Sequence, residues 1–334
     1  MAINNRLKKR LDILPGNPAL VLLENMIWPV LLLTALVVLT LVPSVFTNLP
    51  TIQLMVYAMV PLGLIVLAES ICLLSGHFDL SVGSIAGFSA VFTAMTIGTW
   101  GVVSSPVVGI LLIVAVGSFI GLLNGVFISK LGVNPFLQTL AFLIIFGGGK
   151  LALTTQPVFN LPDGYLLPGD SAPIAVGVML VSFLVVAVVL KYTNFGRAVY
   201  AVGSDKESAR EVGINVDGVI IAVYTMSGFF SALAGLMLTG FIGGVPPDIA
   251  DDMVFPAFAA AIIGGISLFG GRGKLMGAFG GVLLLSLIQT SLNVAGTDPT
   301  VIGVVEGIVL MVAILLYTTK ARIRQRILSS GVAA

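Results

Sequence analysis

Long apolar segments recur along almost the whole chain, separated by short polar connections. A segment needs about 20 apolar residues to cross a hydrocarbon core of about 30 Å, and ten segments meet or approach that length. They lie at about 27–47, 54–75, 80–100, 105–129, 135–155, 172–190, 218–243, 254–270, 275–295 and 300–318. The pattern predicts an all-α, polytopic membrane helical bundle of about ten transmembrane helices, forming one transmembrane domain over 1–334. The first segment begins too far from Met1 for a cleavable secretory signal, so we expect it to be retained.

The composition agrees with this pattern. Apolar residues make up 57% of the chain and charged residues 9%, whereas soluble domains carry about 25% charged residues. So few charges could not cover a water-facing surface, so membrane lipid must be the main solvent. Gly117, Gly121 and Gly125 recur every four residues and predict a helix face on which another helix packs closely. The single cysteine, Cys72, excludes an intramolecular disulfide.

The placement of Lys and Arg predicts the orientation of the spans. If the N-terminus is cytosolic, fifteen of the 16 basic residues fall on the inward side. These are Arg6, Lys8, Lys9, Arg10, Lys130, Lys191, Arg197, Lys206, Arg210, Arg272, Lys274, Lys320, Arg322, Arg324 and Arg326. Only Lys150 falls towards the outer side, where the connections otherwise hold aspartates. We therefore expect an even number of spans with both termini in the cytosol.

The longest inward connection, 191–217, contains a capping-box pattern from Ser204 to Glu207. Acidic residues suit the first turn of a helix and Gly213 suits its end, so we expect a short helix of about two turns. Such a charged helix between two rigid spans could dock another protein, and it could equally be an ordinary solvated connector. The candidate docking residues are Ser204, Asp205, Lys206, Glu207, Arg210 and Gly213.

The connection between the second and third predicted spans is the only inward one without Lys or Arg. Gly76 breaks the helix there, and Asp79 or Ser81 can cap the next one. One interpretation is a plain N-cap in a cytosolic loop. The other is a break at membrane depth, which is tolerated only where it is buried in protein or lines a wet cavity and which transporters use beside their solute.

Other polar residues lie within or beside the apolar segments, where ionisable groups usually face the bundle interior or a pathway. Hydrogen bonding between helices explains them equally well, and the lone His77 has no visible set of metal-ligand partners. The candidates for the translocation path are Glu69, His77, Asp79, Ser81, Asn124, Asn134, Gln138 and Thr139.

On the outer side, Asp248, Asp251 and Asp252 form the densest acidic cluster. Either these carboxylates face basic residues of a docking protein, or they only solvate an interfacial loop.

Several chemistries are missing from the chain. No G-x-x-x-x-G-K-[ST] phosphate loop occurs: Gly273-Lys274 is followed by Leu275, and Leu268 stands where the first glycine should be. If transport uses ATP, a separate chain must hydrolyse it. No cluster of His, Cys or carboxylates has metal-catalytic spacing, so we expect no enzyme activity, no cofactor and no nucleic-acid partner for this chain.

Four stretches carry a resemblance to a known family. They are GHFDLSVGS (76–84), NPFLQTLAFLIIFGG (134–148), RAVYAVGSDKESAREVGI (197–214, directly after Gly196) and IIGGISLFGGRGKLMGAFGGVLLLSLIQTSLNVAG (262–296). These resemble, in order, the permeases of bacterial ABC sugar importers of the ribose, xylose and galactose type, related to the branched-chain amino acid permeases and including autoinducer-2 and nucleoside relatives. The resemblance implies a transmembrane permease for a small polar solute such as a monosaccharide, in the inner membrane of a prokaryote.

The resemblance also implies partners: a second permease subunit, identical or paralogous, cytosolic ATPase subunits that carry ATP and Mg, and an extracytoplasmic solute-binding protein. It implies that the 204–213 helix is the coupling helix seated in a groove of the ATPase. Two departures bear on the solute. His77 and Phe78 stand where the family usually has Gly-Ile, and Asp251 and Asp252 are displaced from its usual acidic-Leu-Asp run. A stand-alone secondary transporter or channel is the alternative from another class, and it would give the 204–213 helix no task.

Overall fold

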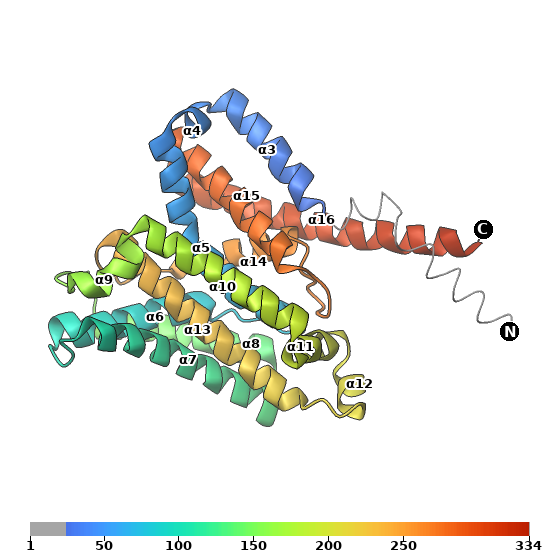
Figure 1. Cartoon of the computed structure of the whole chain (residues 1–334), viewed down its shortest axis with the longest axis horizontal. Helices are drawn as coiled ribbons and strands as arrows, with labels where there is room; N and C mark the ends of the chain where they lie inside the picture. Colours follow the sequence, from blue (N-terminus) through green and yellow to red (C-terminus); the bar gives the residue numbers. More distant parts are fainter. Residues whose placement is uncertain (1–24, 334) are drawn as a thin grey trace.

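The computed structural model describes residues 25–333, and the chain folds as a bundle of helices (Figure 1). The first half comprises α3 (Ile27–Leu41), α4 (Ser44–Thr47), α5 (Leu49–Leu74), α6 (Val82–Ala94), the π-helical turn η1 (Met95–Thr99), α7 (Pro106–Lys130), α8 (Pro135–Leu153) and α9 (Asp163–Asp170). The second half comprises α10 (Ala172–Tyr192), α11 (Asn194–Ser204), α12 (Lys206–Glu211), α13 (Val216–Ile242), the 3₁₀ turn η2 (Asp251–Met253), α14 (Val254–Ile263), α15 (Leu275–Val294) and α16 (Pro299–Ala333).

Seven helices in the described residues are long and apolar enough to cross a membrane. They are Leu49–Leu74, Val82–Thr99, Pro106–Lys130, Pro135–Leu153, Ala172–Tyr192, Val216–Ile242 and Leu275–Val294. Two shorter apolar helices, Ile27–Leu41 and Pro299–Leu315, accompany them. The all-α polytopic bundle is confirmed, whereas the count of ten spans stays a prediction. The terminal basic residues that underlie the predicted orientation, at 6–10 and 320–326, lie outside the described side chains.

Two predicted spans are broken in the structure. The segment 27–47 is divided because α3 ends at Leu41, just before Pro43, and a residue preceding proline disfavours the helical conformation. The predicted span 254–270 is not one continuous helix: α14 has ten residues, which reach only about 15 Å. Glycines with positive φ at 265, 270, 271 and 273 take the chain out of the helix there.

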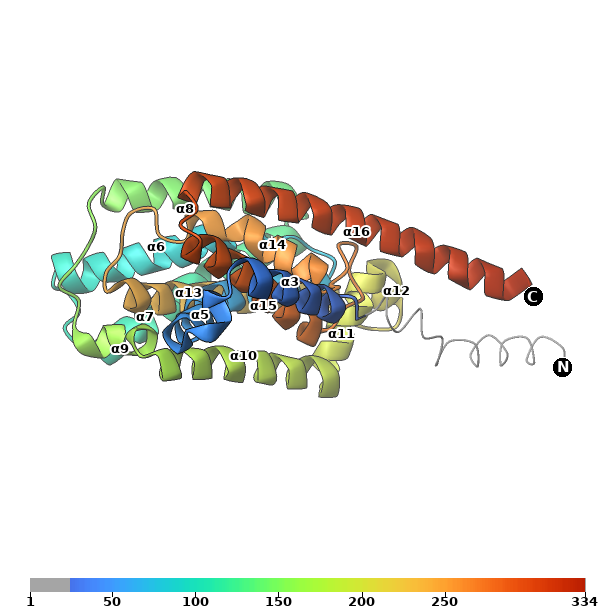
Figure 2. The same ribbon diagram turned by 90° about the horizontal axis from the view of Figure 1, so that it is seen from above.

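The centre of the bundle consists of α5, α6 and α13. Most residues of these helices are buried, whereas at most a third of the residues in the spans of α7, α8 and α10 are buried, as expected for helices that face lipid. Figure 2 shows α8 and α16 along one edge of the bundle and α10 along the opposite edge. Figure 1 shows α9 at one end, and α11, α12 and the C-terminal end of α16 at the other.

The most extensive helix contact is that of α7 with α13, and glycines permit a close approach there, as predicted from their spacing. A methyl group at Gly121 would overlap the carbonyl oxygen of Tyr224, and one at Gly125 would come within 2.7 Å of the Cα atom of Ile221. The two backbones therefore touch where lipid-facing helices would normally be separated by side chains.

We expect Gly121→Ala to destabilise the bundle by about 1–3 kcal/mol, the usual cost of overpacking a tight contact. Gly147→Ala on α8 is the matched control, because nothing lies within 4 Å of a methyl group there. Both changes raise helix propensity equally. The difference between the melting temperatures of the two variants in detergent therefore measures the cost of the overlap between α7 and α13. Equal melting temperatures would contradict this account of the α7–α13 contact.

Candidate functional site

The break between α5 and α6 holds a buried carboxylate that joins two parts of the bundle. Asp79 Oδ1 accepts hydrogen bonds from the backbone N–H of Ser81 (3.0 Å) and from its hydroxyl (2.5 Å). Asp79 Oδ2 accepts from the hydroxyl of Ser227 on α13 (2.7 Å). All three residues are fully buried, so these hydrogen bonds replace water around the carboxylate.

The same network continues into α7 and α8. The Ser81 hydroxyl accepts from Asn124 Nδ2 (2.9 Å), and Asn124 Oδ1 accepts from Gln138 Nε2 (3.4 Å). Four of the predicted path residues, Asp79, Ser81, Asn124 and Gln138, are therefore connected side chain to side chain. We call the chain from Ser227 through Asp79, Ser81 and Asn124 to Gln138 the Asp79 network.

The sequence analysis missed the contribution of α13. Ser227 belongs to the network, and the Tyr224 hydroxyl donates to the carbonyl oxygen of Phe78 (2.7 Å), which fixes the break from the same helix. Tyr224 and Ser227 are three apart in α13, so they share one helix face. That spacing is the signal that could have found them.

The predicted capping of α6 takes a different form. Ser81 occupies the N-cap position, but its side chain makes no capping hydrogen bond. Asp79 satisfies the amide of Ser81 itself, one residue before the helix, rather than an amide of the first turn. The Ser81 hydroxyl is unavailable for capping because it is held between Asp79 and Asn124.

The Asp79 network lies inside the bundle rather than at its end. Asn124 is six residues from the end of α7 at Lys130, and Ser227 is eleven residues from the start of α13 at Val216. Those two helix ends are adjacent, because Lys130 Nζ contacts Asp217 Oδ2 at 2.9 Å. At 1.5 Å per residue, the network lies about 9–16 Å from that end of the bundle. The Asp79 side of the break is thus surrounded by protein, whereas Gly76 itself is partly exposed.

The other predicted path residues have separate surroundings. His77 is buried, with Nδ1 2.9 Å from the Ser75 hydroxyl and the ring 6.0 Å, centroid to centroid, from that of Tyr224. Glu69 is fully buried on α5, and neither carboxylate oxygen has a hydrogen-bond partner among the described residues.

Two further candidates satisfy their polar groups locally. Asn134 is exposed and caps α8 by accepting from the N–H of Phe136 at 2.9 Å. The Thr139 hydroxyl donates to the carbonyl oxygen of Pro135 at 2.8 Å, within α8. Neither side chain joins the Asp79 network.

The predicted docking segment contains two helices instead of one. An additional helix, α11, runs through Ser204, whose hydroxyl donates to the Tyr200 carbonyl oxygen (2.8 Å). The capping box is therefore wrong: α12 is capped by Asp205, which accepts from the N–H of Ser208 at 2.8 Å. The cap moves by one residue because α11 keeps Ser204 helical. The hydrogen bond from Ser208 lowers the pKa of Asp205.

The end of α12 follows the prediction. Gly213 has φ of +83°, and the amides of Gly213 and Ile214 donate to the carbonyl oxygens of Arg210 and Ala209, as in a glycine-terminated helix. The side chains from Ser204 to Glu207 and that of Arg210 are exposed. The segment thus presents a short, charged and capped helix at one end of the bundle (Figure 1).

Of the three predicted outer carboxylates, Asp251 has a partner in this chain. Its Oδ1 atom lies 2.6 Å from Nζ of Lys150 on α8. Asp248 and Asp252 are exposed. Docking of a binding protein stays a prediction for all three aspartates, and Asp251 has in addition a partner within this chain.

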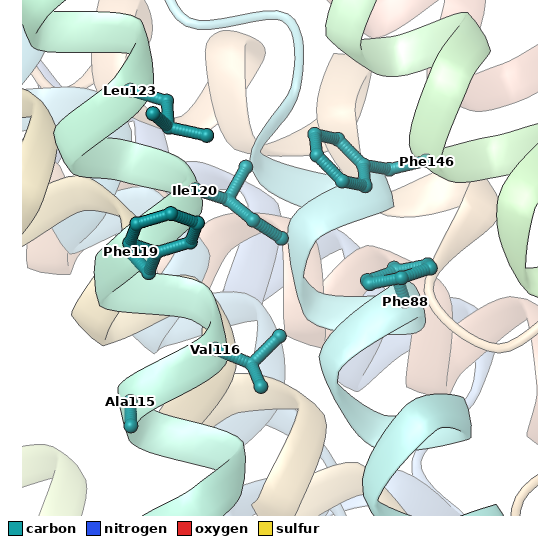
Figure 3. Close-up of a pocket in the computed structure, with 7 residues that line it drawn as sticks. All are labelled: Phe88, Ala115, Val116, Phe119, Ile120, Leu123 and Phe146. Atoms are coloured by element: carbon teal, nitrogen blue, oxygen red, sulfur yellow. The ribbon is translucent and has the colours of Figure 1, made fainter.

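A separate groove of about 460 Å³ lies between α6, α7 and α8 (Figure 3). It is lined by Phe88, Ala115, Val116, Phe119, Ile120, Leu123 and Phe146. None of these side chains can donate or accept a hydrogen bond, so a polar solute would lose its hydration there without replacement. The groove suits the hydrocarbon of the bilayer rather than a sugar.

The bundle and the buried polar network inside it define a multi-pass membrane protein of the transport class. Residues 50–314 match the family model described as branched-chain amino acid transport system / permease component. The chain belongs to that family, and the predicted relationship to ribose-type ABC import permeases is confirmed. No solved structure matches the chain.

Several curated proteins are similar over most of their length. The ribose import permease protein RbsC of Bacillus subtilis is 34% identical over 269 residues, covering 78% of this chain and 82% of that protein. The fructose import permease protein FrcC of Rhizobium meliloti is 31% identical, covering 80% and 77%. The autoinducer 2 import system permease protein LsrC of Photorhabdus laumondii is 30% identical, covering 85% and 86%.

We expect Asp79→Ala to lower the melting temperature in detergent far more than Asp79→Asn. Alanine leaves the buried amide and two hydroxyls without an acceptor, at about 1–3 kcal/mol for each unsatisfied group. Asparagine can still accept from Ser81 through its oxygen and donate to Ser227 through its nitrogen. Thr139→Val is the control, because it removes a buried hydroxyl outside the network. An Asp79→Ala protein as stable as the Thr139→Val protein would show that the network does not stabilise the fold.

Proposed function

We propose that this chain is the transmembrane permease subunit of an ATP-binding-cassette importer in the cytoplasmic membrane of a prokaryote, and that it forms the path for a monosaccharide. The observation that carries the proposal is the Asp79 network, a connected set of hydrogen-bonding groups inside an otherwise apolar bundle. Hydroxyl groups of a sugar require such partners to replace water. The ribose and fructose permeases among the relatives support this solute class.

A second candidate solute is a molecule of the autoinducer-2 type. The permease LsrC, with 86% of its length covered, supports this alternative. His77 stands where the family usually has a small residue, glycine, so the network has a bulkier neighbour than is usual in the sugar branch. A nucleoside is the remaining alternative within the same importer class.

We infer that α12 docks a separate ATPase subunit, which binds ATP and Mg and hydrolyses the nucleotide. The coupling segment, 191–217, would place Lys206, Glu207 and Arg210 in contact with that partner. Their exposure and the two caps that hold α12 rigid support this role. A second permease, identical or paralogous, and an extracytoplasmic solute-binding protein complete the proposed complex. A stand-alone transporter would leave the exposed, capped α12 without a partner.

The coupling segment is also positioned to move the break beside Asp79. The α11 residue Gly203 packs against Gly76, where a methyl group on Gly76 would lie 3.4 Å from the Gly203 Cα atom. Next to them the amide of Gly271 donates to the carbonyl oxygen of Leu74 at 3.0 Å. Only two residues, His77 and Phe78, separate Gly76 from Asp79. A displacement of α11 and α12 by the ATPase would therefore be transmitted directly to the Asp79 network.

The proposal is tested in proteoliposomes that contain the permease, its ATPase and its binding protein. We expect uptake of labelled ribose or fructose to require ATP inside the vesicle, and an excess of autoinducer-2 to leave uptake unchanged. Competition by autoinducer-2 would favour the second candidate solute. Uptake driven by an ion gradient without ATP would contradict the importer class.

In the same vesicles, the double variant Glu207→Arg/Arg210→Glu should lose most of its uptake and its solute-stimulated ATP hydrolysis. Reversed charges at a docked interface repel the partner, at a cost of several kcal/mol. Arg210 also contacts Asp217 (3.3 Å), so Asp217→Asn is the control that removes only this internal pair. Normal stimulation in the double variant, or an equal loss in the control, would contradict docking through α12.

A further inference from the structure

Lys150 is a basic residue buried near the end of α8. Its side chain is 1% exposed, and Nζ donates to Asp251 Oδ1 (2.6 Å) and to the carbonyl oxygen of Ile249 (3.0 Å). The side chain of Asp251 is 47% exposed. One ammonium group therefore holds two neighbouring points of the segment between α13 and α14.

The segment 243–253 lies along α6 inside the bundle, although it is not a regular transmembrane helix. Val245 pairs with Val158 through two backbone hydrogen bonds of 3.0 Å. Further along, the Ala250 carbonyl oxygen lies 2.8 Å from the position that a methyl group on Gly83 would take. The absence of side chains at Gly83 and Gly87 lets this non-helical backbone lie directly on α6.

Measured along α6, the ion pair lies beside the first half of the span, although Lys150 is only three residues from the end of α8. Lys150 Nζ is 3.2 Å from the position that a Cβ atom on Gly87 would take. Gly87 is twelve residues before Thr99, where the α6 span ends, which corresponds to about 18 Å along the helix axis. Irregular backbone at such depth requires surrounding protein or a water-filled cavity.

The two carboxylates of η2, directly before α14, indicate water on one side of this segment. Asp251 and Asp252 are both exposed, and a carboxylate that faces hydrocarbon is strongly unfavourable. By contrast, the exposed residues Ile144 and Ile145 in the middle of α8 are apolar, as lipid-facing positions should be. Two different environments therefore adjoin α8.

We propose that Lys150 is a positioning residue for transport, which holds 249–253 on α6 so that Asp251 and Asp252 border the hydrated solute path. This inference rests on the proposed function, because it assigns the hydrated side to the path. The long lysine side chain passes beside Gly87, where there is no side chain to block it. Without the ammonium group, Asp251 and the Ile249 carbonyl oxygen lose their shared partner, and the segment can leave α6.

The positioning is tested by thiol labelling of Ile249→Cys in a Cys72→Ser background, using the full-length protein in membranes. Ile249 is 3% exposed, so labelling should be slow. We expect Lys150→Met to accelerate it about tenfold or more, because Asp251 and the Ile249 carbonyl oxygen then lose the hydrogen bonds that hold the segment on α6. Because the two side chains act as a pair, Lys150→Met/Asp251→Asn should label no faster than Lys150→Met alone. An unchanged rate in Lys150→Met, or additive effects, would overturn the proposal.

Native Cys72 reports whether the effect is local. Cys72 is fully buried on α5, so in a Lys150→Met protein that retains Ile249 it should stay unlabelled. Labelling of Cys72 at the same accelerated rate would mean that the whole bundle opens, and would overturn a role confined to 249–253.

The hydrated side is tested with a charged thiol reagent at Asp252→Cys, with Ile144→Cys as the matched lipid-facing control. We expect Asp252→Cys to react about tenfold faster or more, because thiolates form in water and not in hydrocarbon. Equal rates at the two positions would overturn the placement of Asp252 beside a hydrated path. These labelling measurements need no ATPase, so their failure is distinguishable from a failure of the importer function.

In the complete reconstituted importer, Lys150→Met should reduce the maximal rate of solute uptake severalfold or more while the ATPase still assembles with the permease. An unchanged uptake rate, despite faster labelling at Ile249→Cys, would overturn the role of Lys150 in transport. If the wild-type importer carries no ribose or fructose, the proposed function fails, whereas the labelling result on Lys150 still stands.

Discussion

A charged group can lie inside this bundle only if protein atoms replace its water, and the carboxylate of Asp79 illustrates how the rest of the structure meets that requirement. Ser81 and Ser227 supply three hydrogen bonds to it, and Asn124 and Gln138 extend the polar chain across two more helices. The orientations of α6, α7, α8 and α13 at this level are tied together through these side chains. Loss of one partner would leave others unsatisfied in a medium of low dielectric constant, where the penalty is largest.

The Asp79 network also requires close contact between helix backbones. Serine and asparagine side chains are short, so helices that connect through them must approach closely. Gly121 on α7 and Gly228 on α13 permit this approach, because a methyl group on either would overlap backbone atoms of the other helix. The glycines thus set the short distance between the helices, and the hydrogen bonds of the polar side chains require that distance.

Irregular backbone lies at two places within the bundle, and different contacts hold each of them in place. The break at Gly76 is held by neutral hydroxyls and amides around one carboxylate. The segment 243–253 is held by the ion pair of Lys150 with Asp251, next to glycines of α6. The two places meet at the N-terminal end of α6, where Gly83 contacts Ala250 and Val254. A transporter needs regions that can rearrange within a rigid frame, and irregular segments fixed by a few polar contacts fulfil that need better than continuous helices do.

The apolar segments of the sequence determined the all-helical membrane architecture, because burial in lipid requires about 20 apolar residues whatever the packing. Local chemistry also determined the glycine end of α12 and the break at Gly76, since these depend on backbone conformation alone. The sequence could not determine that Ser204 continues α11 and leaves Asp205 as the cap, that α14 stops after ten residues, or that Asp251 pairs with Lys150. Each depends on contacts between residues far apart in the chain or on competition between neighbouring helices for one residue.

Only the tertiary structure decided which polar residues in the apolar segments meet. The side chains of Asp79, Ser81, Asn124 and Gln138 are joined, whereas Asn134 and Thr139 make hydrogen bonds within their own helix. The physical reason is that the position and rotation of each helix set which side chains come within hydrogen-bond distance.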